Sequence, residues 1–115
     1  MFRFEELEIW KLSVSYGKDC YKIASLFPKY EIFALSDQLR RASLSISNNI
    51  AEGSVGSSAN FKKYINTAIG SMLETVNILN FAYEIGYIKL ISKNEMYNRA
   101  ELIIKKMHSF SKSLN

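Results

Sequence analysis

The sequence predicts an all-α protein, an antiparallel four-helix bundle with up-down-up-down topology. Apolar residues recur three and four positions apart along four segments, which is the spacing of one helix face. The single proline, Pro28, and five glycines suffice for the three breaks of a bundle, but they are too few for the turns of a β-sandwich. The 115 residues, 48% of them hydrophobic, are enough for one core, so we expect residues 1–115 to form a single domain.

The first helix is expected from Leu7 to Phe27, because the residue before Pro28 is biased away from helical geometry. One apolar rank along it, expected to pack the bundle, consists of Leu7, Trp10, Val14, Gly17, Tyr21 and Ala24. A second rank consists of Ile9, Leu12, Tyr16, Cys20, Ile23 and Phe27. This second rank faces either another subunit or a broad core of the same chain. The candidate residues of an oligomer interface are Ile9, Leu12, Tyr16 and Ile23.

The second helix is expected from Leu35 to about Glu52, with an apolar face made of Leu35, Leu39, Ala42, Ile46 and Ile50. Gly53 and Gly56 suit the loop that ends it, and Ser57 or Ser58 can cap the third helix. The third helix then continues to Gly86, a residue favoured just after a helix end. Its apolar face consists of Phe61, Ile65, Ala68, Met72, Val76 and Leu79.

The fourth helix is expected to begin after Ser92, because Ser92 and Glu95 have the spacing of a capping box. Its apolar face consists of Met96, Ala100, Ile103, Met107, Phe110 and Leu114. The connections between successive helices are short, so neighbouring helices must run antiparallel.

Several classes of protein are disfavoured by composition. Cys20, the only cysteine, cannot form an internal disulfide, and acidic residues stand where a signal peptide needs a basic start. We therefore expect a cytoplasmic protein. No apolar run has the length of a membrane span, so we expect no membrane partner.

Catalytic and metal-binding motifs are not found. His108 is the only histidine, which leaves a zinc site short of ligands. Neither Glu74 nor Glu84 has a histidine three residues later, as a di-iron bundle requires. The glycines after the second helix follow a helix instead of a strand and lack the lysine of a phosphate-binding loop. We expect no catalytic residue, no cofactor and no small-molecule substrate.

The second helix carries a line of polar residues at i, i+4, i+7 and i+11, namely Arg41, Ser45, Asn48 and Glu52, with Asn49 beside it. The line is a solvent-facing stripe, a catalytic site, or an enclosed hydrogen-bond network that includes Glu74 of the third helix. For the network we expect Arg41 to pair with Glu52, Glu74 or both. The candidate members are Arg41, Ser45, Asn48, Asn49, Glu52 and Glu74.

Basic residues give the chain a net charge of +4 and occur in adjacent pairs. Neighbouring residues differ by about 100° around a helix, so the two members of a pair cannot share one face. These residues either keep the surface soluble or contact phosphate groups. The candidates for nucleic-acid binding are Arg40, Lys62, Lys63, Lys105 and Lys106.

Four sequence segments carry a resemblance to a known family: FEELEIW, FPKYE, LSDQLRRASLSISNNIAEG, and AIGSMLETVNIL followed by EIGYI. In these segments the chain resembles the 23S rRNA intervening sequence proteins, relatives of the accessory protein of diversity-generating retroelements. Three positions depart from the family pattern. Val55 and Gly56 replace a glycine-arginine pair that is common after the second helix, and Asn60 stands where an acidic residue is frequent.

The resemblance implies an antiparallel bundle that assembles into a ring, most often a homopentamer, without known enzymatic activity. It also implies possible partners, because the retroelement relatives contact a reverse transcriptase and RNA or DNA through a basic surface. Two functions therefore stay open. One is a nucleic-acid-binding or reverse-transcriptase-accessory module, and the other is a structural or protein-interaction module without affinity for nucleic acid.

Overall fold

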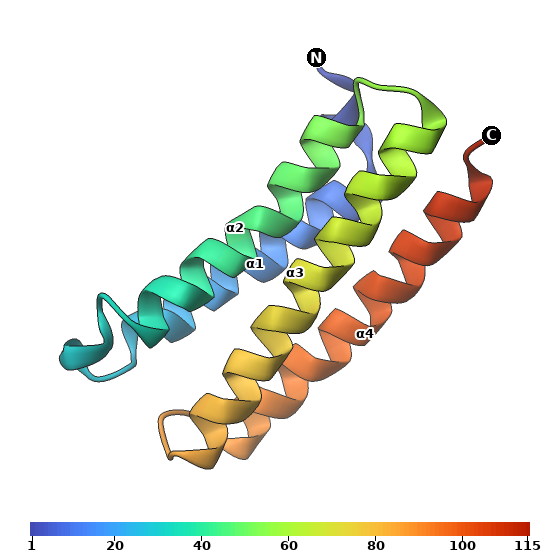
Figure 1. The fold of residues 1–115 in the computed structure, drawn as a ribbon. Helices are drawn as coiled ribbons and strands as arrows, with labels where there is room; N and C mark the ends of the chain where they lie inside the picture. Colours follow the sequence, from blue (N-terminus) through green and yellow to red (C-terminus); the bar gives the residue numbers. More distant parts are fainter.

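The computed structural model describes all 115 residues and contains four α-helices and no strand. The helices are α1 (Glu8–Ser25), α2 (Leu35–Gly53), α3 (Ser58–Glu84) and α4 (Leu90–Ser113). Each helix runs antiparallel to the next, as the sequence predicts, and the two termini lie at the same end (Figure 1). The bundle measures 45 × 24 × 22 Å. None of its helices is long and apolar enough to cross a membrane.

The inward face of α1 is the second apolar rank, not the first. Ile9, Tyr16 and Cys20 are buried, whereas Trp10 is half-buried and Tyr21 is exposed. The two ranks lie next to each other on the helix, so their spacing alone does not say which one points inward. Of the first rank, Ala24 is in the core and Leu7 and Trp10 pack against it, so the prediction that this rank packs the bundle is wrong for Val14 and Tyr21.

The core combines 20 buried apolar side chains from all four helices and from Phe27. The predicted apolar faces of α2, α3 and α4 supply most of them, which confirms the helical periodicity on these three elements. One position on α3 differs. Thr75 is fully buried, whereas the predicted core residue Val76 is half-buried. The hydroxyl of Thr75 can be buried because it donates a hydrogen bond to Met72 O at 2.6 Å.

The two predicted helix starts have different outcomes. Ser57 caps α3, and its hydroxyl accepts a hydrogen bond from the Asn60 amide at 3.1 Å. Ser92 does not cap α4, which begins two residues earlier at Leu90 with Lys89 as its N-cap residue. The preceding Tyr87 and Ile88 pack against the core and fix the chain there, so the helix starts before the capping-box motif. Gly86 has the positive φ of 85° expected after a helix end.

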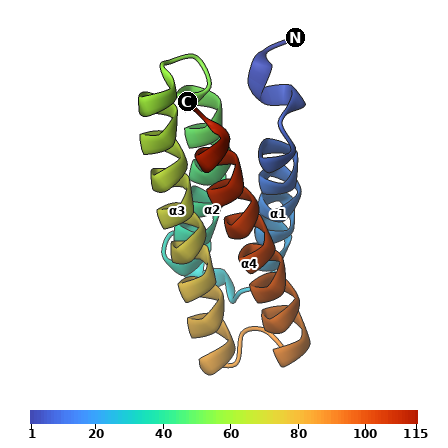
Figure 2. The same ribbon diagram turned by 90° about the vertical axis from the view of Figure 1, so that its right-hand side faces the viewer.

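Two connections meet at the end of the bundle opposite the termini (Figure 2). The hydroxyl of Tyr87, after α3, donates to Glu31 Oε2 at 2.6 Å and lies 3.0 Å from the hydroxyl of Tyr30. The ring of Phe27 packs on Tyr87 with centroids 5.5 Å apart. These contacts tie the α1–α2 connection to the α3–α4 connection.

Candidate binding surfaces

The polar line of α2 begins with an exposed arginine. The side chain of Arg41 is 80% exposed, and its Nε donates to Asp37 Oδ2 at 2.7 Å, one turn earlier on the same helix. Glu52 and Glu74 are both exposed and form no ion pair with it. The prediction of an enclosed Arg41 network is therefore wrong, because a carboxylate on the same helix face already meets the guanidinium.

A smaller group of polar contacts lies in the middle of this line. The hydroxyls of Ser45 on α2 and Ser71 on α3 lie 2.9 Å apart. The side-chain amide of Asn49 donates to the carbonyl of Ser45 at 2.7 Å and to its hydroxyl at 3.1 Å. Ser45 and Asn49 are half-buried, and Asn48 is exposed. The contact couples α2 to α3 and has no charged member.

The predicted oligomer-interface residues divide into two pairs. Ile9 and Tyr16 are only 3% and 0% exposed within a single chain, so they cannot contact a second subunit and their assignment is wrong. Both fill space between the helices, where an isolated bundle needs bulky apolar side chains. Leu12 and Ile23 are half-buried against the core, and they stay candidates.

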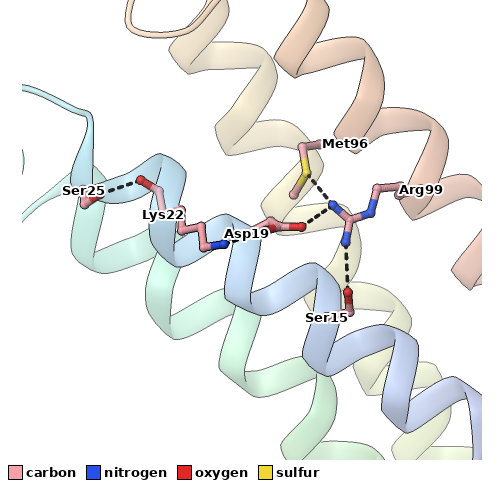
Figure 3. A network of polar contacts seen from close by, with 6 residues as sticks. All are labelled: Ser15, Asp19, Lys22, Ser25, Met96 and Arg99. Atoms are coloured by element: carbon pink, nitrogen blue, oxygen red, sulfur yellow. Dashed lines mark hydrogen bonds and ion pairs between the residues drawn. The ribbon is translucent and has the colours of Figure 1, made fainter.

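Ion pairs connect α1 to α4, and the sequence patterns did not reveal them. Arg99 on α4 donates from Nη1 to Asp19 Oδ2 at 2.6 Å and from Nη2 to Ser15 Oγ at 3.5 Å (Figure 3). Its guanidinium also lies 5.7 Å from the ring centroid of Tyr16. Because Asp19 and Arg99 are 80 residues apart, no helical spacing could have paired them.

The buried titratable groups of α1 are neutral near pH 7. Tyr16 and Thr75 share a hydrogen bond of 2.8 Å between their hydroxyls, and burial raises the pKa of Tyr16. Burial also raises the pKa of the Cys20 thiol to about 12, which keeps it from acting as a thiolate. No group of three or more His, Cys, Asp or Glu side chains is arranged to hold a metal ion, and His108 is exposed.

The candidate basic residues do not form one continuous patch. Lys62 and Lys63 lie near the start of α3, next to Phe61, whose ring contacts that of Phe110 at a centroid distance of 5.4 Å. Lys105 and Lys106 precede Phe110 by about one helical turn, and Lys105 lines the groove between α3 and α4. Lys106 donates to Glu8 at 3.1 Å, whereas Lys62, Lys63 and Lys105 form no ion pair. Arg40 is separate, with its guanidinium 5.9 Å from the ring centroid of Tyr21 on α1.

Two open grooves mark the surface. The larger, between α1 and α2, has a volume of about 630 Å³ and includes much of the first apolar rank of α1. Its lining residues are Phe4, Trp10, Ser13, Val14, Gly17, Lys18, Tyr21, Lys22, Ser43, Leu44, Ser47, Asn48 and Ala51. The smaller, between α3 and α4, has a volume of about 320 Å³ and is lined by residues that include Leu73, Val76 and Tyr97.

Comparison with known proteins identifies the family. No curated protein sequence matches this chain. A solved structure from Bacteroides thetaiotaomicron VPI-5482, described as a protein of unknown function from the S23 ribosomal protein family, has the same fold, with a TM-score of 0.82 at 24% identity. The match covers 90% of this chain and 95% of that chain. The model of the 23S rRNA-intervening sequence protein family matches residues 5–109, and the chain therefore belongs to this family.

Proposed function

We propose that this protein is a cytoplasmic, non-catalytic binding module that assembles with copies of itself and contacts RNA or DNA through one basic end. The observation that carries the proposal is the state of three lysines. Lys62, Lys63 and Lys105 lie in the half of the bundle that holds the two termini, Lys105 on the groove between α3 and α4, and none of them forms an ion pair. A lysine without a partner is free to neutralise a phosphate and release its counterion.

Assembly would supply the affinity that one subunit lacks. Three phosphate contacts per subunit give weak binding, but linked copies act at a high effective concentration. A pentamer of subunits that each carry +4 would carry about +20. The half-buried Leu12 and Ile23 offer apolar surface for the contact between subunits.

A second candidate function is a protein-interaction module without affinity for nucleic acid. The groove between α1 and α2 favours it, because exposed apolar grooves of this kind are typical of protein contacts. A reverse transcriptase would be one such partner. The two functions differ in their dependence on phosphate and salt.

Fluorescence anisotropy with labelled mixed-sequence RNA and DNA at several salt concentrations separates them. We expect binding that weakens steeply as salt rises, and Lys63→Glu should weaken it more than Lys29→Glu. Lys29 is a matched control, since it is exposed and lies at the opposite end of the bundle. Absence of binding at low salt, or equal losses in the two variants, would contradict the nucleic-acid proposal.

A further inference from the structure

The groove between α1 and α2 has the length of a short helix. Trp10 and Tyr21 both line it and are 11 residues apart on α1, which corresponds to about 16 Å or three helical turns. Two antiparallel helices form its sides, so a third helix can lie along it as α3 and α4 lie along the rest of the bundle.

The floor of the groove is apolar in its chemistry although it contains serines. The hydroxyls of Ser13, Ser43 and Ser47 donate to carbonyls of their own helices, at 2.6, 2.9 and 3.3 Å. Each floor hydroxyl has therefore already used its one proton. The floor therefore offers no free hydroxyl proton to a polar ligand, and the side-chain donors among the other lining residues belong to Trp10, Lys18, Tyr21, Lys22 and Asn48.

The walls carry large apolar side chains that stay partly exposed. Leu44 on α2 is 50% exposed and Tyr21 on α1 is 43% exposed. Between the two helices the floor is made of small residues, and Gly17 approaches α2 closely, since an added Cβ there would contact the carbonyl oxygen of Ser43 at 3.6 Å. The small floor between large walls leaves room for anchoring side chains of a partner.

Charge is distributed unevenly along the groove. Lys18 lines one end and Arg40 covers Tyr21 near it, and neither forms an ion pair. Lys22, at the same end, has only a long contact of 3.8 Å with Asp19. At the other end, the sequence neighbours of the lining residues carry both signs: Arg3 and Glu5 flank Phe4, Lys11 follows Trp10, and Glu52 follows Ala51.

We infer that this groove binds an amphipathic helix of a partner protein, one with an apolar stripe and with Asp or Glu in its last turn. Its acidic last turn lies at Lys18 and Arg40, because these cations attract both the carboxylates and the C-terminus, the negative end of the helix dipole. The partner helix therefore runs parallel to α1. This binding requires no nucleic acid and is independent of the basic end.

A second copy of the chain that docked through its α3–α4 groove would fit the α1–α2 groove less well than a separate helix. The groove between α3 and α4 is itself hollowed by about 320 Å³. Two concave surfaces leave a gap when they meet, so this face lacks the ridge that the α1–α2 groove would accept. A separate helix has that convex shape.

The test uses the fluorescence of Trp10, the only tryptophan, which lies in the groove. The probe is a tryptophan-free helical peptide of about 18 residues, with leucine at i, i+4, i+7 and i+11 and glutamate in its last turn. The control peptide has lysine in place of these glutamates. We expect a blue shift of Trp10 with the first peptide and an affinity at least about tenfold lower for the second.

Variants locate the site. Leu44→Glu should abolish the blue shift, and Leu73→Glu, the matched change in the groove between α3 and α4, should leave it unchanged. Lys18→Glu, a change of an exposed residue, should remove the preference for the acidic peptide. Equal affinity for both peptides, no shift with either, or equal losses in the two leucine variants would overturn the inference. So would a Leu44→Glu protein whose mass in light scattering falls to that of one chain, because a second copy would then occupy the groove.

Discussion

The two sides of α1 differ in what covers them. On the side of α4, Tyr16 is buried and Asp19 is bound to Arg99. On the side of α2, Tyr21 remains exposed beside a groove of about 630 Å³. Both sides have an aromatic residue and an apolar rank, so composition does not distinguish them. Partners supplied by distant helices decide which rank becomes core and which becomes binding surface.

The largest effect is expected from Tyr16→Ala. Removing a fully buried aromatic ring should lower the free energy of unfolding by about 3–5 kcal/mol, because it leaves a cavity and takes away the hydroxyl that meets Thr75. Urea denaturation followed by circular dichroism measures it. A loss below about 1 kcal/mol would place Tyr16 outside the core.

A pH dependence should follow from Cys20. Its folded-state pKa is raised to about 12 by burial, whereas an unfolded thiol loses its proton near pH 8.5. Only the unfolded chain ionises between these values, so the free energy of unfolding should fall with rising pH by about 1.4 kcal/mol per unit above pH 8.5. Denaturation of the wild type and of Cys20→Ala from pH 7 to 10 measures this slope, and equal slopes in the two proteins would contradict it.

A smaller effect is expected from Asp19→Asn. The side chains of Arg99 and Asp19 are 28% and 38% exposed, so solvent screens their attraction and the loss should be about 1 kcal/mol. Glu8→Gln is the matched control. Glu8 is 67% exposed in its pair with Lys106, so this substitution should lower the free energy of unfolding by less. Thermal unfolding of both variants compares the two ion pairs, and a larger cost for Glu8→Gln would reverse their order.

The smallest effect is expected on the open side of α1. Leu44→Glu should change the free energy of unfolding by no more than about 0.5 kcal/mol, since Leu44 is 50% exposed and a glutamate there can reach water. The same urea denaturation measures it. A loss of several kcal/mol would mean that the groove is part of the core.

Sequence periodicity was sufficient for the helices and for the inward faces of α2, α3 and α4, because each of these has one dominant apolar stripe. It failed on α1, where two adjacent ranks compete. It also failed where a polar partner had to be chosen. Arg41 pairs with Asp37 on its own helix, and Arg99 reaches Asp19 across 80 residues of sequence.

The candidate nucleic-acid-binding lysines are a second case in which the sequence does not identify the partner of a charged side chain. Their positions in the chain were known, but whether each lysine is free depends on neighbours from other helices. Lys106 is engaged by Glu8 at 3.1 Å, and Lys105, the next residue, forms no ion pair. Two lysines that are adjacent in the sequence therefore differ in the fold: one is in an ion pair and the other is not.

Acrylamide quenching of Trp10, measured together with light scattering over a series of protein concentrations, tests most directly whether the α1–α2 groove is an open binding surface. Trp10 is half-buried and lies in the groove, so the quenching constant should be that of a partly exposed indole. It should stay the same at every mass, including that of an assembled ring. Protection of Trp10 that rises together with the mass would contradict this, because another copy of the chain would then cover the groove.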